Sequence, residues 1–428
     1  MSPVSERPLR VLLAWELGAN LGHLLRLLPI AQALHALGHM VSLAVPDPAA
    51  VRERMGPLPW EVLRIPRPVR GDETEPACFA QILAMHGFGA DDLLGDAMRA
   101  WQRLLSVARP DVLLADHAPL ALLAGRLYRV PAVHVATGWE SPPFGGTLPI
   151  LRPAMPEAEP SRVRALEDSI VARINRLCVE HQAPPMQVLG EVFRAQLSLL
   201  ATWPEIDHFQ PRPDRPWFAV GDPRRQPTCI GPLFSADTGA PAAWPQGQGP
   251  RVFVYMQRGP ATAAVLRHLG AIGARVVASV PGATMAERNA AGPSCQLHDA
   301  PVRLDSVLPQ ADLVLSHGSH GLTAASLLAG VPMVSVPMQM EQATLTQQVR
   351  RLGAAELLRP ADVESQGRDL IVRVLGTPSY RDAANAMARR HAGFDPRVVA
   401  RRIAASIEHM GRHFAQGAQA SVPEEART

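Results

Sequence analysis

Three short segments of the chain combine side chains that can do chemistry with glycines that let a backbone approach a ligand. The first is GANLGH, residues 18–23, in which His23 follows a glycine-rich turn and starts an apolar helical pattern. Imidazole titrates near neutral pH, so His23 is suited to act as a general base. Taken alone, it could also be an ordinary polar residue near a helix start.

The second segment is DVLLAD, residues 111–116, which reads as a buried strand ending in Asp116. A carboxylate at the carboxyl end of such a strand can orient a histidine and stabilise its charge. Alternatively, Asp116 could cap the helix that follows Pro119. Strand alternation places the adjacent His117 on the opposite side, so we rank it lower.

The third segment, DLVLSHGSHGLTAASLLAGVP at residues 312–332, runs from a buried strand through a Gly/Ser loop into a helix. That geometry presents backbone N–H groups and the positive helix end to an anion, and His317 and Ser319 add side-chain donors. All 42 Lys+Arg residues are arginine, which excludes Schiff-base and phosphate-loop lysine chemistry. The segment is therefore the best candidate phosphate site in the chain. The alternative is a glycine-containing strand-to-helix turn that binds no phosphate, because its sequence pattern would be similar.

Glu341 and Gln342 follow the next strand-like run. Adjacent carboxylate and amide groups offer acceptors and donors suited to vicinal hydroxyls of a sugar. The alternative is a helix N-terminus with a favourable acid.

The elements that must position these residues alternate between strand and helix. Residues 10–17, 40–46, 111–116 and 132–137 read as strands of one series, and residues 251–256, 274–280, 311–316 and 331–337 as strands of a second. The pattern predicts an α/β protein with two doubly wound Rossmann-like domains and an interdomain cleft. We expect domains at 1–234 and 251–395, a linker at 235–250, and a helix and tail at 396–428 that pack back on the N-terminal domain. Between 141 and 222 the pattern loosens, apart from a helix at 161–180.

Composition excludes several classes of function. The net charge is only +3 and no Lys/Arg run reaches five residues, so neither nucleic acid nor an anionic membrane is an expected partner. The four cysteines are scattered without metal-ligand spacing, which favours a reducing compartment and predicts no metal site. We find neither a signal-peptide pattern nor an apolar span of ~20 residues, and expect a cytoplasmic protein without a membrane span.

Residues 311–355 resemble the donor-binding signature of the UDP-glycosyltransferase superfamily. These GT-B enzymes include the bacterial macrolide and natural-product glycosyltransferases. The familiar pattern is a strand, His-Gly-Gly-x-Gly-Thr, an apolar helix, Gly-Val-Pro, a second strand, and Asp/Glu-Gln. The Gly-His at 22–23, Leu-Leu-Ala-Asp at 113–116 and Gly-Pro-Leu at 231–233 also match in the same order.

The resemblance implies an inverting, metal-independent transfer of a hexose from a UDP- or dTDP-linked sugar to a hydroxyl of a small hydrophobic acceptor, without a cofactor. His23 would be the base and Asp116 its charge partner, in an N-terminal domain that binds the acceptor. The C-terminal domain would bind the donor through the diphosphate contacts His317, Gly318, Ser319, His320 and Gly321, the sugar contacts Glu341 and Gln342, and Val302 against the nucleobase.

Four positions depart from the family pattern. Ser319 replaces the second glycine, and Leu322 stands where threonine is usual, with Thr323 one step on as the candidate phosphate contact. Arg26 stands where proline is common, and Arg258 replaces small residues near the phosphates. These departures keep two alternatives open. One is a nucleotide-sugar hydrolase, epimerase or cell-envelope sugar transferase on the same fold, and the other is a catalytically degenerate GT-B binding protein.

Overall fold

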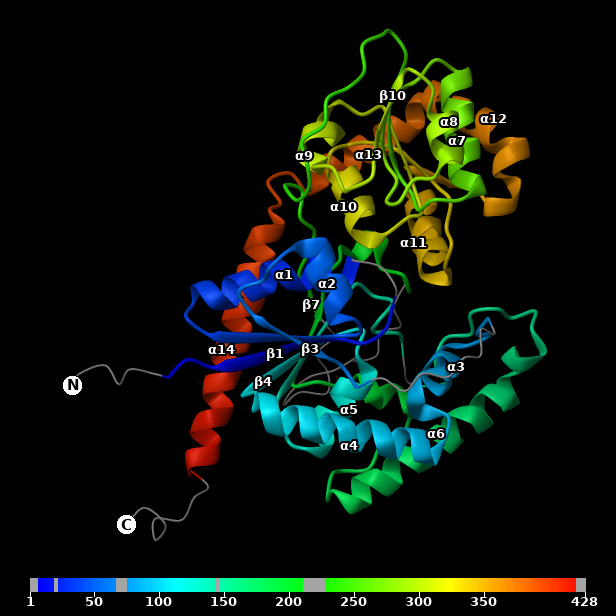
Figure 1. The fold of residues 1–428 in the computed structure, drawn as a ribbon. Helices are drawn as coiled ribbons and strands as arrows, with labels where there is room; N and C mark the ends of the chain where they lie inside the picture. Colours follow the sequence, from blue (N-terminus) through cyan, green and yellow to red (C-terminus); the bar gives the residue numbers. More distant parts are fainter. Residues whose placement is uncertain (1–6, 19–21, 67–74, 144–145, 211–227, 421–428) are drawn as a thin grey trace. The chain divides into compact units, whose positions relative to one another are not determined.

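The structure is a computed structural model that describes residues 7–18, 22–66, 75–143, 146–210 and 228–420 (Figure 1). Contacts divide the chain into two units. Unit 1 comprises Met1–Thr202, Pro211–Gly231 and Arg397–Thr428, and unit 2 comprises Trp203–Gln210 and Pro232–Pro396.

Unit 1 is built on a seven-stranded parallel sheet with the order β3-β2-β1-β4-β5-β6-β7. Its strands are β1 (Arg10–Trp15), β2 (Met40–Val45), β3 (Glu61–Arg64), β4 (Val112–Asp116), β5 (Ala132–Ala136), β6 (Leu197–Leu200) and β7 (Thr228–Cys229). The direction of winding reverses between β1 and β4, which is where open α/β sheets bind ligands. The predicted strands β1, β2, β4 and β5 are confirmed, whereas β6 lies in a stretch that we expected to be irregular.

Helices cover both faces of this sheet. Figure 1 shows α1 (Gly22–Ala36) and α2 (Pro48–Met55) on one face, and α4 (Asp91–Ala108) and α5 (Pro119–Leu127) on the other. A short helix α3 (Phe79–Leu83) runs into a π-helical turn, η1 (Ala84–Phe88), and α6 (Pro160–Glu180) forms at the predicted helix. The last helix, α14 (Pro396–Ala420), runs in unit 1 from Arg397 onward. A Cβ on Gly411 would lie 2.7 Å from Cδ1 of Leu9, so α14 packs tightly against the start of β1.

Unit 2 has a six-stranded parallel sheet with the order β10-β9-β8-β11-β12-β13. The strands are β8 (Arg251–Tyr255), β9 (Arg275–Ser279), β10 (Cys295–His298), β11 (Leu313–Ser316), β12 (Met333–Ser335) and β13 (Ala355–Leu357). Along β8, Val252 and Val254 enter one apolar cluster and Phe253 enters another. Both faces of the sheet are therefore buried, as is typical of parallel sheets.

The helices of unit 2 also form two layers. Helix α7 (Pro260–Ala271) contacts α8 (Met285–Ala291) and α12 (Val363–Gly376), while α10 (His320–Leu328) contacts α13 (Pro378–Arg390). The remaining helices are α9 (Leu304–Val307) and α11 (Met340–Arg351). Two doubly wound parallel sheets thus confirm the predicted fold class.

The segment that we predicted as a linker, 235–250, packs on unit 2. Ala240 forms a parallel bridge with Val302, and the Arg303 N–H donates to the Ala240 carbonyl at 2.9 Å. The Ala242 N–H donates to Oγ of Ser306 at 3.3 Å. Hydrogen bonds therefore tie part of this segment to residues just before and within α9.

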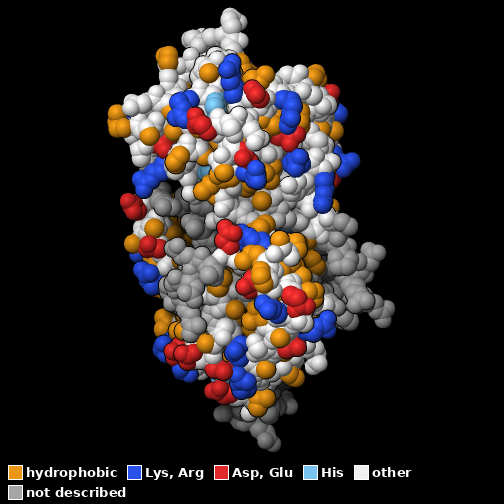
Figure 2. Space-filling model, turned by 90° about the vertical axis from the view of Figure 1, so that its right-hand side faces the viewer, with side chains coloured by type: hydrophobic (Ala, Val, Ile, Leu, Met, Phe, Trp, Pro, Cys, Tyr) orange, Lys and Arg blue, Asp and Glu red, His pale blue; other side chains and the backbone are white. Residues whose placement is uncertain are grey.

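Within the described ranges, no helix has the length and apolar character needed to cross a membrane. On the face that Figure 2 shows, arginines are interspersed with acidic side chains and apolar patches. That mixture agrees with the small net charge of +3.

Candidate functional site

The two residues predicted as a catalytic pair meet at the switch point of the unit 1 sheet. Trp15 pairs with Asp116 in the β1–β4 register, so both strands end at the same level. Helix α1 then begins at Gly22 and carries His23 on its first turn. His23 Nδ1 lies 3.0 Å from Oδ1 of Asp116, which is fully buried. The structure therefore brings together an imidazole and a carboxylate in a geometry suited to general-base catalysis.

A glycine makes room for the His23 ring. Gly18 has φ +94°, and a Cβ at this position would lie 2.6 Å from His23 Nε2. On another side, the ring stacks on Trp15 with centroids 5.5 Å apart. Any side chain at Gly18 would collide with the nitrogen that a base uses, since Nδ1 faces Asp116.

Asp116 does not cap helix α5. The N-cap position is Ala118, and the N–H of Leu120 in the first turn donates to Oε2 of Glu16 at 2.9 Å. The other oxygen of Glu16 accepts from the Trp101 indole at 3.2 Å. Because Glu16 accepts the hydrogen bond at the helix start, the carboxylate of Asp116 can interact with His23 and Arg26 instead.

His117 lies on the same side as His23, so the expectation from strand alternation is wrong. Strand β4 ends at Asp116, and His117 adopts a left-handed backbone with φ 47° that turns its ring back. The two imidazole centroids are 5.4 Å apart. Burial lowers the pKa of His117 to about 3, with a smaller repulsive contribution from His23. His117 is thus a neutral ring beside the candidate base.

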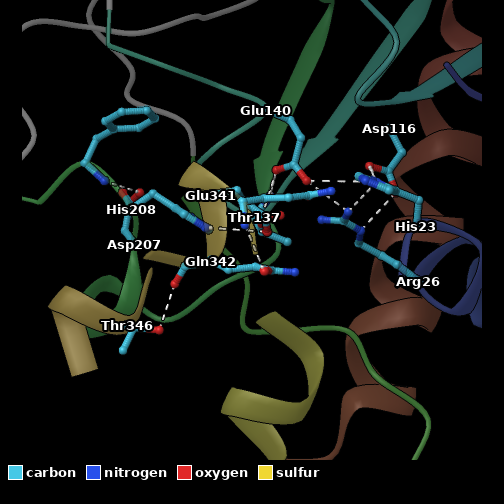
Figure 3. A network of polar contacts seen from close by, with 12 residues as sticks. His23, Arg26, Asp116, Thr137, Glu140, Asp207, His208, Glu341, Gln342 and Thr346 are labelled. Atoms are coloured by element: carbon cyan, nitrogen blue, oxygen red, sulfur yellow. Dashed lines mark hydrogen bonds and ion pairs between the residues drawn. The ribbon is translucent and has the colours of Figure 1, made fainter. Parts of the chain in front are cut away.

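Sequence reasoning missed the roles of two further residues at this place, Arg26 and Glu140 (Figure 3). Arg26 Nε lies 2.9 Å from Oδ2 of Asp116, and its Nη2 lies 3.0 Å from Oε1 of Glu140. The second oxygen of Glu140 accepts from the N–H and hydroxyl of Thr137, at 2.7 and 2.8 Å. The only available signal was an arginine one helical turn after His23, where the family pattern favours proline.

A metal ion fits this group poorly. His23, His117 and Glu140 offer ligand atoms within 4.8 Å of one another, a group that could hold a cation. However, Nη2 of Arg26 lies 2.8 Å from His23 Nδ1 and 3.0 Å from Glu140. A guanidinium stays positive at any relevant pH, so it opposes a second positive charge. We assign no metal here.

In unit 2, the predicted phosphate loop runs from the end of β11 into α10, beside the switch point between β8 and β11. Gly318 has φ +81°, and a Cβ there would lie 2.8 Å from Oγ1 of Thr346. A Cβ on Gly321 would lie 3.3 Å from Cβ of Phe234, so both glycines allow close packing. Ser319 is the N-cap residue and makes no side-chain cap. The start of α10 therefore offers backbone N–H groups that its own cap residue does not use.

His317 has both ring nitrogens engaged by backbone. Nδ1 donates to the Val336 carbonyl at 2.7 Å, and Nε2 accepts from the Gln257 N–H at 2.8 Å. Burial lowers the pKa of His317, so the ring is neutral. In this geometry it fixes the ends of neighbouring strands, and a phosphate would have to compete with these bonds for its side chain.

The neighbouring helix α7 has its N-terminus occupied by a carboxylate. The Gly259 N–H donates to Oε1 of Glu287 at 2.7 Å, and the Thr284 N–H donates to Oε2 at 2.8 Å. Burial by itself would raise the pKa of Glu287, but hydrogen bonds from Thr284 and Gly259 outweigh it and the pKa is lowered. The acid therefore stays ionised at α7, which leaves α10 as the better place for an external anion.

The other predicted donor residues lie in different environments. Thr323 is buried in α10, as is Leu322 at the departing position before it, and the side chain of Val302 is buried in the apolar cluster of unit 2. His320 is buried at the helix start. Arg258 is exposed, close to Gly282, at the carboxyl end of β8.

Glu341 and Gln342 stand on the first turn of α11 (Figure 3). The side-chain oxygen of Gln342 accepts from the N–H groups of Met338 and Gln339, at 2.8 and 3.2 Å, so it caps the helix. Glu341 Oε1 lies 3.7 Å from Nε2 of His208, a buried residue that no sequence motif singles out. The His208 ring also stacks on His320, with centroids 6.1 Å apart.

Comparisons of the sequence point to enzymes that transfer sugars. Residues 263–406 match the family model described as "Erythromycin biosynthesis protein CIII-like, C-terminal domain". The chain is 26% identical over 413 residues to a PGL/p-HBAD biosynthesis glycosyltransferase of Mycobacterium tuberculosis, covering 90% of this chain and 89% of the relative. It is 30% identical over 165 residues to the TDP-daunosamine transferase DnrS of Streptomyces peucetius, covering 37% of each chain.

Solved structures match the fold along almost the whole chain. The spinosyn rhamnosyltransferase SpnG aligns with a TM-score of 0.65 and 22% identity, covering 94% of this chain and 100% of that chain. The same protein has also been solved with thymidine diphosphate, at a TM-score of 0.63 and 23% identity over 92% of this chain and 99% of that one. The two sheets described above are therefore those of a GT-B fold.

Proposed function

Because the chain belongs to the macrolide and natural-product glycosyltransferase family, whose members use nucleotide sugars, we propose the following reaction. The protein transfers a hexose from a dTDP- or UDP-linked donor to a hydroxyl of a small hydrophobic acceptor, with inversion at the anomeric carbon. The acceptor binds unit 1 and the donor binds unit 2.

The contact between His23 and Asp116 carries this proposal. With Nδ1–H donating to Asp116 at 3.0 Å, the lone pair of Nε2 is available to take the acceptor's hydroxyl proton. The oxygen then attacks the anomeric carbon and the nucleoside diphosphate leaves. Asp116 stabilises the imidazolium that forms, as the acid of a catalytic triad does.

The leaving diphosphate carries negative charge that unit 2 can receive. The α10 N-terminus supplies N–H groups and the positive end of the helix dipole. This mode of stabilisation needs neither lysine nor metal. Glu341 offers a carboxylate to hydroxyls of the donor sugar.

Of the two nucleotides, the dTDP form has more support among the relatives. DnrS is a TDP-daunosamine transferase by name, and SpnG has been solved with thymidine diphosphate. SpnG has also been solved with its spinosyn aglycone, which supports a small hydrophobic acceptor here.

The test is a transfer assay with dTDP- and UDP-sugars against a panel of hydroxylated aglycones, with and without a chelator. We expect transfer that the chelator leaves unchanged. His23→Ala should lower kcat by about 10²–10⁴-fold, the usual range for a general base, and leave dTDP affinity in calorimetry unchanged. His35→Ala is the matched control, because His35 is exposed on the same helix.

Two results would contradict the proposal. Rapid donor turnover without any acceptor would indicate a hydrolase or epimerase. Unchanged transfer by His23→Ala would remove His23 from the reaction.

A further inference from the structure

Arg26 is a buried cation inserted between two buried acids. It is 5% exposed, Asp116 is 0% and Glu140 is 2%. Its guanidinium touches Asp116 through Nε at 2.9 Å and Glu140 through Nη2 at 3.0 Å. Removing charges from water is costly unless they are paired, so each of the three groups depends on the others.

The same guanidinium also reaches the candidate base. Nη2 of Arg26 lies 2.8 Å from His23 Nδ1, while Oδ1 of Asp116 lies 3.0 Å from that nitrogen. A neutral imidazole nitrogen either donates or accepts. His23 Nδ1 must therefore choose between donating to Asp116 and accepting from Arg26.

The choice determines whether His23 can act as a base. If Nδ1 carries the proton and donates to Asp116, Nε2 can accept a proton from the acceptor hydroxyl. If Nδ1 accepts from Arg26, the proton sits on Nε2 and the ring cannot take another there. Arg26 and Asp116 thus favour opposite tautomers.

Glu140 is placed to decide this competition. Its carboxylate draws Nη2 through one oxygen, while Thr137 holds the other oxygen with two hydrogen bonds of 2.7 and 2.8 Å. We propose that Glu140 is a positioning residue: by holding the guanidinium of Arg26, it lets Asp116 select the Nδ1–H tautomer of His23. This inference rests on the proposed role of His23 as the base.

Charge in this cluster also controls the pH range of activity. When His23 is neutral, the formal charges of Asp116, Glu140 and Arg26 add up to one negative charge. Burial lowers the pKa of His134 on β5 to about 4 and that of His117 to about 3, so both stay neutral near pH 7. Among the residues that the structure describes, His86 of the π-helical turn also acts electrostatically on His117.

Three variants test the proposal. Glu140→Gln makes the cluster neutral and releases Nη2 toward Nδ1. Arg26→Met removes the cation that Asp116 and Glu140 share and leaves two negative charges. The double variant restores one negative charge and removes the competing donor. Folding of each is checked by thermal denaturation, and dTDP affinity by calorimetry.

We expect kcat of Glu140→Gln to fall about tenfold or more, since a general base contributes about 10²–10⁴-fold, with little change in donor KM. The acid limb of its pH–rate profile moves to lower pH, and that of Arg26→Met moves to higher pH. The double variant regains kcat relative to Glu140→Gln and has an acid limb close to that of the wild type.

The tautomer is read directly from ¹⁵N chemical shifts of His23, with the signal assigned by its loss in His23→Ala. We expect the Nδ1–H form in the wild type and the Nε2–H form in Glu140→Gln. Unchanged tautomers, or acid limbs that move in the same direction in both single variants, would overturn the proposal. If the tautomer changes as expected but His23→Ala remains active, the positioning inference holds and the proposed function fails.

Discussion

At the scale of single residues, Glu341 lies beside a buried histidine that no sequence motif predicts. Its carboxylate lies 3.7 Å from Nε2 of the fully buried His208, and that ring stacks on His320. The sugar contact proposed for Glu341 would therefore lie next to the His208 ring.

We therefore expect His208→Gln to raise the donor KM about tenfold, equivalent to about 1.4 kcal/mol, with little change in kcat. Initial rates over a donor concentration series measure both. Glu205→Gln is the matched control in the same segment, because it loses contacts to Arg390 and His391 instead. An equal rise in donor KM in both variants would show that the segment matters only through stability.

His23 and Asp116 were accessible to sequence reasoning because each lies at the end of a recognisable element. The parallel register then brings those ends together. Glu140 was not accessible in this way, because its bond to Arg26 joins residues 114 positions apart. His117 was misplaced because period-two alternation stops where the strand stops, and its left-handed backbone follows no signal in the sequence.

At the scale of elements, helix α6 carries a buried acid that makes stability depend on pH. Burial raises the pKa of Glu167 to about 7, and its Oε1 accepts from the Leu148 N–H at 2.6 Å. The folded state therefore binds a proton that the unfolded state, with a carboxyl pKa near 4.5, has already lost. The free energy of unfolding should fall as pH rises from about 4.5 to about 7.

Glu167→Gln keeps an acceptor for Leu148 and removes the ionisation. We expect this variant to be more stable than the wild type at pH 8 by about 1–3 kcal/mol, and to lose that advantage near pH 5. Urea denaturation at the two pH values measures the difference. Asp168→Asn, exposed at the next position, removes only a repulsion that adds to the raised pKa of Glu167, so its gain should be smaller. A gain of equal size there would contradict the assignment to burial.

Several strands that are continuous apolar runs in the sequence were predicted, whereas β6 was not. Strands β1, β4, β8 and β11 are apolar runs bounded by turns. Strand β6 has four residues and owes its conformation to pairing with β5. Such a strand is defined by its partners rather than by its own propensity.

At the scale of the whole molecule, the chain passes between the two units more than once. Trp203–Gln210 belongs to unit 2 although it precedes part of unit 1 in sequence, and α14 enters unit 1 at Arg397. Contacts such as that of Gln348 with the His208 carbonyl, at 3.0 Å, hold the inserted segment in unit 2. These crossings depend on tertiary contacts between residues far apart in the sequence.

The position of the nucleotide can also be tested on the whole molecule. Two helices, α7 and α10, begin at the switch point of unit 2, and Glu287 already occupies the start of α7. A nucleotide at 100 times its dissociation constant should add about 2.7 kcal/mol of stability. We expect hydrogen exchange across the whole chain to show protection by dTDP at residues 316–323, and none at 257–263.

The buried strands β1 and β4 serve as the internal reference. Protection at the start of α7 without protection at α10 would contradict our placement of the diphosphate, because a bound phosphate at α7 would have to displace a buried, ionised carboxylate.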